Sequence, residues 1–231
     1  MPSTYTVTTV LWMLITAIPA YFCGCFNGAV IVSKYILHDD VRNHGSGNAG
    51  LTNFHRTFGG KLTAVVLLLD VAKMVAAVFL AQGSWMGIQY LQAGGVTGAP
   101  WRELTPTMNL YSKYWAGLWC LLGHMFPCTF GFKGGKGILS GVTLLFCVDW
   151  RVGAIALGLF VVMVALTRYI SLGSILATAS SPVSLYFLDD PDPVVLGLAV
   201  AVALLVIFMH RGNIGRLIRG TENRFSLHRK Q

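Results

Sequence analysis

About seven apolar runs separated by short polar segments are the feature that most limits how this chain can fold. The chain has 231 residues, of which 55% are hydrophobic and only 11% are charged, whereas a soluble domain averages about 25% charged residues. A chain of this length could not enclose so much apolar surface in a soluble core. Long apolar runs broken by polar loops are instead typical of membrane-spanning helices. The runs cover residues 7–36, 62–81, 114–130, 138–148, 152–166, 170–188 and 194–209.

The runs predict an all-α integral membrane protein with about seven transmembrane helices, in which residues 1–231 form a single membrane-embedded domain. Several runs are shorter than the roughly 20 residues of a perpendicular span. The run at 138–148 is the least secure, and if it does not span the membrane, the topology after it inverts. Residues 82–113 are rich in Gly, Pro and aromatic residues, so we expect a loop there.

The basic residues predict the orientation of these spans. If the segments alternate from an outside N-terminus, the excess of Lys and Arg collects on one side, which the positive-inside rule makes cytoplasmic. We therefore expect an outside N-terminus and a cytoplasmic C-terminus. The cytoplasmic set is Lys34, Arg42, Arg56, Lys61, Lys133, Lys136, Arg168, Arg211, Arg216, Arg219, Arg224, Arg229 and Lys230. The outside set is Arg102, Lys113 and Arg151, with Glu103, Asp149, Asp189, Asp190 and Asp192.

Net charge and cysteine content argue against two other classes of protein. The formal charge is +8, but the basic residues are spread over short loops rather than along one soluble face, so we expect no nucleic-acid partner. The five cysteines lie in or beside apolar runs without zinc-type spacing, and we interpret them as packed thiols.

The polar segment 45–56 contains groups suited to an anion. Its alternating glycines allow backbone N–H groups to turn toward one point. A helix beginning near Thr52 would direct its positive end there, and Arg56 adds a fixed charge suited to bidentate phosphate contact. The segment is not a Walker A loop, because the Gly-Lys-Ser/Thr ending is missing. The alternative interpretation is a flexible, polar membrane loop.

Three further polar segments fall on the same predicted side. Residues 132–137 place Lys133 and Lys136 three apart among glycines, where both could close on one phosphate, although a basic loop also serves to set topology. Ser171 and Ser174 share a helix face in the segment 167–174, but serines in membrane helices more often bond to a backbone carbonyl.

The last of these segments, 210–222, follows the final span. His210 and Asn213 face one direction if the chain is helical there. A histidine at the end of a span is often only interfacial, yet the Asn one turn later and Arg216 beyond it favour a polar site.

One ionisable pair lies within the membrane. Asp70 and Lys73 are three residues apart on the predicted second span, and because ionisable groups in a membrane are costly, we expect them to pair. A buried structural pair is favoured over a direct role on the substrate.

Taken together, the polar segments resemble the signatures of the PlsY-type acyl-phosphate:glycerol-3-phosphate acyltransferases of bacteria, in the family's order and spacing. Ala49 departs from the usual proline, which could alter the loop. The matching residues are Gly45-Ser46-Gly47-Asn48 with Gly50, Thr52, Asn53 and Arg56; Gly-Phe-Lys-Gly-Gly-Lys-Gly at 131–137; Arg168 to Leu172; and His210, Asn213, Ile214, Arg216 and Leu217 with Gly220-Thr221-Glu222.

The resemblance implies a multi-pass enzyme of the bacterial plasma membrane with its site at the cytoplasmic face. It would transfer a fatty acyl group from acyl phosphate to the 1-hydroxyl of sn-glycerol 3-phosphate, giving lysophosphatidic acid and phosphate for phospholipid synthesis. The resemblance implies neither acyl-CoA as donor nor a metal or cofactor. Its partners would be these two substrates and the membrane lipids. A membrane transporter of phosphate or an organic phosphate is the alternative, although no internal repeat is visible.

The site residues are assigned on the same resemblance. The donor phosphate is expected at the loop amides of Ser46, Gly47 and Asn48, with Thr52, Asn53 and Arg56. The glycerol phosphate is expected at Lys136, Ser174, His210 and Asn213, with Lys133 and Ser171 as alternatives for Lys136 and Ser174. Catalysis would come mainly from positioning and electrostatics. The general base is either His210 or an oxygen of a substrate phosphate.

Overall fold

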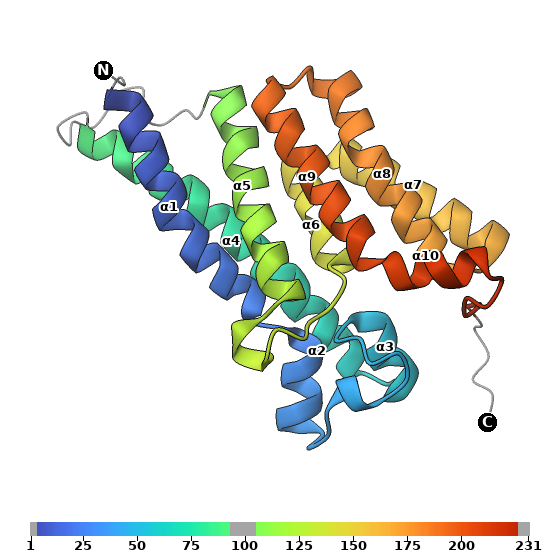
Figure 1. Ribbon diagram of the computed structural model, residues 1–231. Coiled ribbons are helices and arrows are strands. Elements are labelled where there is room, and N and C mark those ends of the chain that lie inside the picture. Colours follow the sequence, from blue (N-terminus) through green and yellow to red (C-terminus); the bar gives the residue numbers. More distant parts are fainter. Residues whose placement is uncertain (1–3, 93–104, 226–231) are drawn as a thin grey trace.

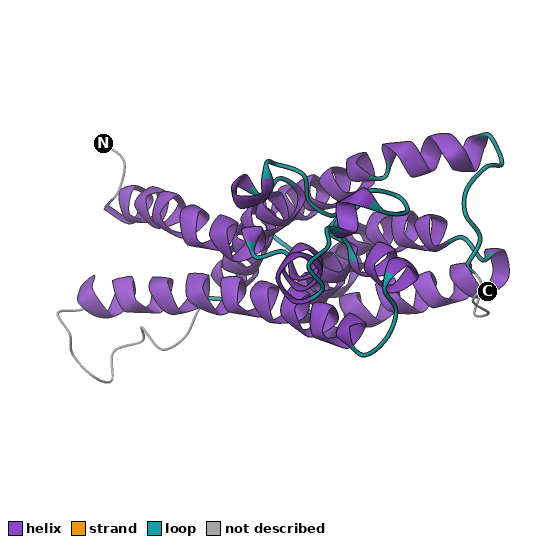
Figure 2. Cartoon of the chain, turned by 90° about the horizontal axis from the view of Figure 1, so that it is seen from below, coloured by secondary structure: helices purple, strands orange, loops and turns teal. Residues whose placement is uncertain are grey.

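The computed structural model is a bundle of helices, and it describes residues 4–92 and 105–225. Over these residues the chain forms helices, loops and turns without strands (Figure 2), which confirms the all-α prediction. The principal helices are α1 (Thr4–Cys25), α4 (Leu62–Gln92), α5 (Pro106–Met125), α6 (Ile138–Val148), α7 (Trp150–Thr167), α8 (Ile170–Asp189) and α9 (Pro193–Met209).

Short helices gather at one end of this bundle. They carry or flank the polar segments singled out in the sequence, and Figure 1 shows α2, α3 and α10 at the end opposite the first turn of α1. These elements are α2 (Gly28–Ile31), the π-helix η1 (Val32–Ile36), the 3-10 helix η2 (Val41–Asn43), α3 (Leu51–Thr57), the 3-10 helix η4 (Cys128–Phe130) and α10 (Arg211–Ile218).

The helix α5 lies at the centre of the bundle. It contacts α1, α4, α6 and α9, and its polar residues Ser112 and His124 are buried among these neighbours. The backbones of α1 and α5 touch, because a Cβ on Gly24 would collide with the Cys120 carbonyl and one on Gly123 with the Tyr21 carbonyl. Small residues of this kind let membrane helices approach closely.

In the part of the chain that the structure describes, four helices are long and apolar enough to cross a membrane: α1, α4, α7 and α8. A fifth span results if α9 and α10, bent by 59° at His210, are counted as one. The helix α6 has only 11 residues, and α5 is less apolar on average than α1, α4, α7 and α8. From residue 138 onward the predicted runs agree with α6 to α9 to within two residues at each end, so these four segments are confirmed as helices.

The first predicted run was wrong at its C-terminal end. The helix α1 ends at Cys25, and the chain restarts as α2 and η1 instead of continuing to Ile36. The break lies at Asn27, whose backbone is extended and whose side-chain Oδ1 caps the new helix by accepting from Val30 N. Hydropathy averaged over the run conceals this single capping residue.

The second and third predicted runs were also wrong at their ends. The helix α4 continues to Gln92, into the segment 82–113 that was expected to be a loop. The helix α5 starts within the same segment, at Pro106, after the N-cap Thr105. Trp85 holds the extension of α4 by packing edge-on against Trp12, with ring centroids 5.3 Å apart. At its other end α5 stops at Met125, because Pro127 cannot continue it.

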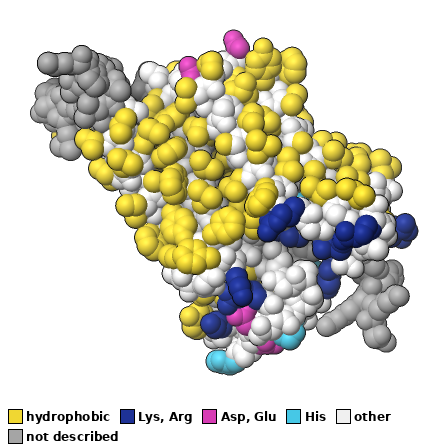
Figure 3. Space-filling view, in the orientation of Figure 1, with side chains coloured by type: hydrophobic (Ala, Val, Ile, Leu, Met, Phe, Trp, Pro, Cys, Tyr) yellow, Lys and Arg dark blue, Asp and Glu magenta, His cyan; other side chains and the backbone are white. Residues whose placement is uncertain are grey.

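Charge and hydrophobicity separate on the surface. Figure 3 shows a broad hydrophobic face, with Lys and Arg side chains below it toward the end where α2, α3 and α10 lie. Four of the charged residues used to predict orientation, Arg102, Glu103, Arg229 and Lys230, lie outside the described residues.

Candidate functional site

A cavity of about 320 Å³ opens between the short helices and the lower ends of α6, α8 and α9, within the size range of small-molecule sites, roughly 300–1,000 Å³. Segments far apart in the sequence meet there. The predicted site residues that line the cavity are Ser46, Asn48, Thr52, Asn53, Arg56, Lys136, Ser171, Ser174, His210 and Asn213. Gly47 and Lys133 do not line it.

The loop before α3 is shaped largely by Asn53. Its Nδ2 donates to the carbonyls of Val41 and His44, both at 3.0 Å, and its Oδ1 accepts from Ser46 N at 3.0 Å. Gly47 N also donates within the loop, to His44 O at 2.9 Å. The side chains of Ser46, Asn48 and other cavity-lining residues, rather than these two amides, are therefore the groups left to meet an anion.

The helix α3 begins at Leu51, close to the expected start, and runs for seven residues. It brings Thr52, Asn53 and Arg56 to the cavity wall. Arg56 is exposed, and its charge helps to lower the pKa of Lys136 across the cavity.

The structure distinguishes the two lysines of the glycine loop. The Lys136 ammonium reaches into the cavity and donates to Asn213 Oδ1. Burial, and then the charge of Arg216, lowers the pKa of Lys136. Lys133 is exposed, and its backbone carbonyl accepts a hydrogen bond from Arg42. Of the two alternatives, Lys136 is the one that the fold brings to the site.

Glu222 connects the helices α8 and α10 at the cavity. Its Oε1 accepts from Ser171 Oγ at 2.8 Å and from Asn213 Nδ2 at 2.7 Å, and its Oε2 accepts from Arg216 Nε at 2.7 Å. Burial alone would raise the pKa of Glu222, but these hydrogen bonds outweigh it and hold that pKa below its ordinary value. Glu222 belongs to the motif at residues 210–222 but was not among the predicted site residues.

His210 is buried at the C-terminal end of α9. Its Nδ1 lies 2.8 Å from the carbonyl of Val206, which only accepts, so Nδ1 carries the proton and a neutral ring presents a free lone pair at Nε2. Burial lowers the pKa of His210 and favours this neutral form. A backbone carbonyl, rather than a carboxylate, thus orients the ring.

The two serines of α8 differ in what their hydroxyls contact. Ser171 Oγ is bonded to Glu222, whereas Ser174 Oγ donates back to the Ile170 carbonyl of its own helix at 2.9 Å. Ser174 is more deeply buried than Ser171, and both line the cavity. Their lone pairs remain able to accept from a ligand.

The cavity also has an apolar part between α6, α7, α8 and α9. Side chains from all four helices form it, so a polar mouth leads to a space suited to an aliphatic chain. These side chains are Leu145, Leu157, Phe160, Ala177, Val202 and Val206. Among residues 4–92 and 105–225, no group of three or more His, Cys, Asp or Glu side chains is arranged to hold a metal ion.

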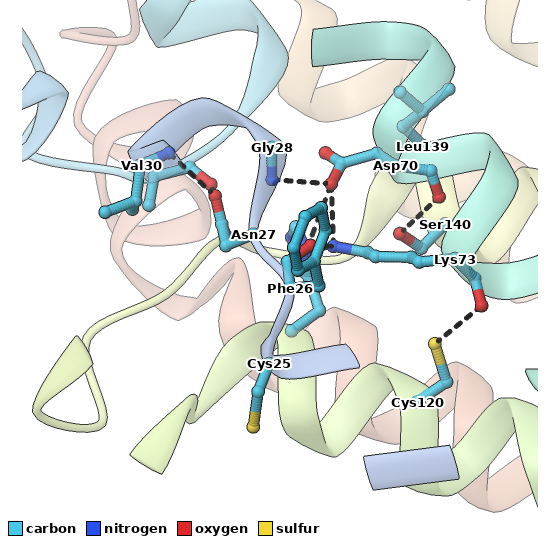
Figure 4. Close-up of polar contacts among 12 residues, drawn as sticks. Cys25, Phe26, Asn27, Gly28, Val30, Asp70, Lys73, Cys120, Leu139 and Ser140 are labelled. Atoms are coloured by element: carbon cyan, nitrogen blue, oxygen red, sulfur yellow. Dashed lines mark hydrogen bonds and ion pairs between the residues drawn. The ribbon is translucent and has the colours of Figure 1, made fainter. Parts of the chain in front are cut away.

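The expected pairing of Asp70 and Lys73 is present beneath the cavity. Figure 4 shows Lys73 Nζ directed at the Asp70 carboxylate, and the distance to Oδ1 is 2.6 Å. Lys73 Nζ also lies 2.7 Å from Nδ1 of His124, which the sequence analysis did not connect with the pair. Asp70 and His124 both line the cavity.

Comparison with known proteins gives consistent matches. A family model described as "Glycerol-3-phosphate acyltransferase" matches residues 14–220. A protein of that name from Thermoanaerobacter sp. (strain X514) is 38% identical over 214 residues, which are 93% of this chain and 96% of the relative. One from Clostridioides difficile (strain 630) is 33% identical over 213 residues, covering 91% of this chain and 94% of the relative.

Solved structures match at the level of the whole fold. A crystal structure of PlsY (YgiH), an integral membrane glycerol 3-phosphate acyltransferase in its glycerol 3-phosphate form, has a TM-score of 0.77 and 32% identity, covering 93% of this chain and 96% of that one. The lysophosphatidic acid form of PlsY (YgiH) has a TM-score of 0.75 and 31% identity, covering 93% and 95%.

Proposed function

The chain belongs to the glycerol-3-phosphate acyltransferase family, and on that premise we propose that its cavity transfers a fatty acyl group from acyl phosphate to the 1-hydroxyl of sn-glycerol 3-phosphate. It is accordingly a membrane enzyme of phospholipid synthesis. The products are lysophosphatidic acid and inorganic phosphate, and acyl-CoA does not serve as donor. The observation that supports this assignment best is the meeting of a basic mouth and an apolar branch in one cavity. A transporter has no comparable support.

The charges around the mouth suit two phosphate substrates. Each phosphate monoester carries roughly −1.5 to −2 at neutral pH. Arg56, Lys136 and Arg216 line the cavity, and Arg216 is paired with the Glu222 carboxylate. We assign the donor phosphate to Arg56 and the polar side chains of the 45–53 loop. The glycerol phosphate is assigned to Lys136 and Asn213, with Ser174 and His210 beside them.

The transfer itself needs little chemistry from the protein. The 1-hydroxyl oxygen of glycerol 3-phosphate attacks the acyl carbonyl carbon, the bond from that carbon to the phosphate oxygen breaks, and phosphate leaves with the electron pair. An oxygen of the phosphate, whose second pKa is ~6, takes the hydroxyl proton. The free Nε2 of His210 instead accepts a hydrogen bond from the 2-hydroxyl and so positions the 1-hydroxyl beside it. Catalysis then depends on positioning and on charge stabilisation.

The topology completes the proposal. Seven spans, formed by α1 and α4 to α9, would place the N-terminus outside and the C-terminus in the cytoplasm. The grouping of the basic side chains with the cavity end of the bundle supports this orientation. The enzyme would then lie in the bacterial plasma membrane with its cavity open to the cytoplasmic face.

A donor-exchange assay tests the proposed reaction. Purified protein is given radiolabelled glycerol 3-phosphate with either palmitoyl phosphate or palmitoyl-CoA, and lysophosphatidic acid and free phosphate are measured. We expect equimolar products with acyl phosphate and none with acyl-CoA. Product from acyl-CoA alone would refute the proposed donor and leave the acyltransferase family assignment intact.

A further inference from the structure

We propose that Asp70, Lys73 and His124 form a buried positioning cluster. It holds two polar loops of the cavity, the first at residues 45–50 and the second at residues 131–137, at the separation that acyl transfer requires. The inference rests on the proposed function, because it concerns how the two phosphate substrates are aligned. The three residues are not expected to touch the reacting atoms.

The cluster is almost fully buried and internally neutralised. The exposed fractions are 1% for Asp70, 5% for Lys73 and 3% for His124. Lys73 Nζ lies 2.6 Å from Asp70 Oδ1, 2.7 Å from His124 Nδ1 and 3.4 Å from the Phe26 carbonyl. Well-packed apolar residues often replace a buried ion pair without loss of stability. Stability alone therefore does not account for charges at this depth.

Hydrogen bonds lead from the cluster to the first loop. Asp70 Oδ1 accepts from Gly28 N at 3.3 Å, which fixes the start of α2 (Figure 4). The neighbouring Asn27 donates from Nδ2 to the Ala49 carbonyl at 3.1 Å. Ala49 lies between the cavity-lining residues Asn48 and Gly50. The cluster therefore helps to hold the first loop in position through the start of α2.

The second loop rests on His124 itself. Gly135 N donates to the His124 carbonyl and Gly134 N to the Met125 carbonyl, both at 3.1 Å. The imidazole lies so close to Gly135 that a Cβ there would collide with Nε2. Lys136 follows directly and reaches Asn213. The orientation of the His124 ring therefore limits where the backbone that carries Lys136 can lie.

The ring is held from the side away from the loop. The Lys73 ammonium only donates, so Nδ1 of His124 accepts and Nε2 carries the proton. The loops also meet each other, since Ala49 N donates to the Gly134 carbonyl at 3.4 Å. If the Lys73 bond to Nδ1 is lost, the ring can turn and release the backbone at Gly135.

Two substitutions separate the two nitrogens of the ring. In His124→Asn an amide atom occupies nearly the place of Nδ1 and can accept from Lys73, whereas in His124→Gln the amide reaches nearly the place of Nε2. His124→Leu removes both nitrogens, and Ser112→Ala, a buried polar change at the other end of α5, is the matched control. Rates are measured with both substrates varied, together with the thermal transition of each purified protein.

His124→Asn keeps the contact to Lys73 but loses the one to Gly135, and His124→Gln does the reverse. We therefore expect all three His124 variants to lose about 100-fold in kcat, the order of effect that a misplacement of about 1 Å produces, and Ser112→Ala to stay close to wild type. Deuterium exchange of residues 131–137, measured without substrate, should be faster in the three His124 variants alone. Wild-type kcat in the Asn or the Gln variant would overturn the proposal, because one of the two contacts of the ring would then be dispensable. Unchanged exchange, or loss of activity that follows loss of thermal stability, would also overturn it. A wild-type protein without acyl transfer would refute the proposed function, while the exchange result still decides on the cluster.

Discussion

The contacts of Glu222 provide a quantitative test of the site. Glu222→Ala removes the acceptor that holds Asn213 and Ser171, at 2.7 and 2.8 Å. A hydrogen bond to a charged group contributes roughly 1.5–3 kcal/mol. The contact to Arg216, whose side chain is 37% exposed, adds little. If only the Asn213 bond affects the transition state, kcat/KM should fall roughly 10- to 150-fold, since each ~1.4 kcal/mol is a factor of ten.

The assay varies glycerol 3-phosphate at saturating acyl phosphate, with the thermal transition recorded for each protein. Glu222→Gln keeps a neutral acceptor in the same place, so its kcat/KM should lie between those of the wild type and the alanine variant. Asp190→Asn is the matched control, because Asp190 is exposed in the α8–α9 connection, at the other end of the bundle. Wild-type kcat/KM in Glu222→Ala would refute the reasoning, as would an effect of equal size in the control.

Four further results are expected. Arg56→Ala should lose roughly 1.5–3 kcal/mol of transition-state stabilisation and Arg56→Lys should recover part of it, because lysine lacks the planar fork; wild-type turnover of the alanine variant would remove Arg56 from the site. Lys136→Ala should be severely impaired and Lys133→Ala nearly normal, and the reverse order in the same steady-state assay would contradict the placement of the loop. Burial lowers the pKa of His210, so protonation of the ring, and any loss of activity that it causes, should come below pH ~6.5. His210→Asn should raise KM for glycerol 3-phosphate and leave the kcat profile from about pH 5 to 8 unchanged, whereas disappearance of an acidic limb below pH ~6.5 from the kcat profile would identify a general base. A tag placed after Gln231 should be inaccessible to a membrane-impermeant label in intact cells, and labelling from outside would refute the proposed orientation.

The sequence predicted some helices far better than others, for a physical reason. The segments from residue 138 onward are strongly apolar and end at residues with clear capping roles, such as Asp149 and Asp192, whose side chains accept from the next helix's backbone. The first run contains Asn27, a single polar residue that starts a new helix within apolar sequence. A hydropathy value is an average over many residues, whereas a helix cap depends on one side chain and the backbone conformation of one residue.

The site was predictable in its membership more than in its contacts. Ten of the twelve predicted site residues line the cavity, but the spacing left Lys133 open as an alternative to Lys136. In the structure, the backbone N–H groups of Gly134 and Gly135 donate to carbonyls at the end of α5, and this directs Lys136 inward. The hydrogen bond from Lys73 to His124 joins residues 51 positions apart in the sequence, so no local sequence pattern could predict it.

The central position of α5 has a consequence for how the protein is made. A charged residue at the middle of a helix costs roughly 2.5–3.5 kcal/mol on insertion by the translocon. Lys113, in the first half of α5, therefore makes this helix a poor candidate for entering lipid alone. Its close partners α1 and α4 are synthesised first and can receive it, whereas α6 and α9 arrive later and enclose it. A bulky side chain at Gly24 or Gly123 should accordingly impair membrane insertion of α5 during synthesis, before it could affect turnover.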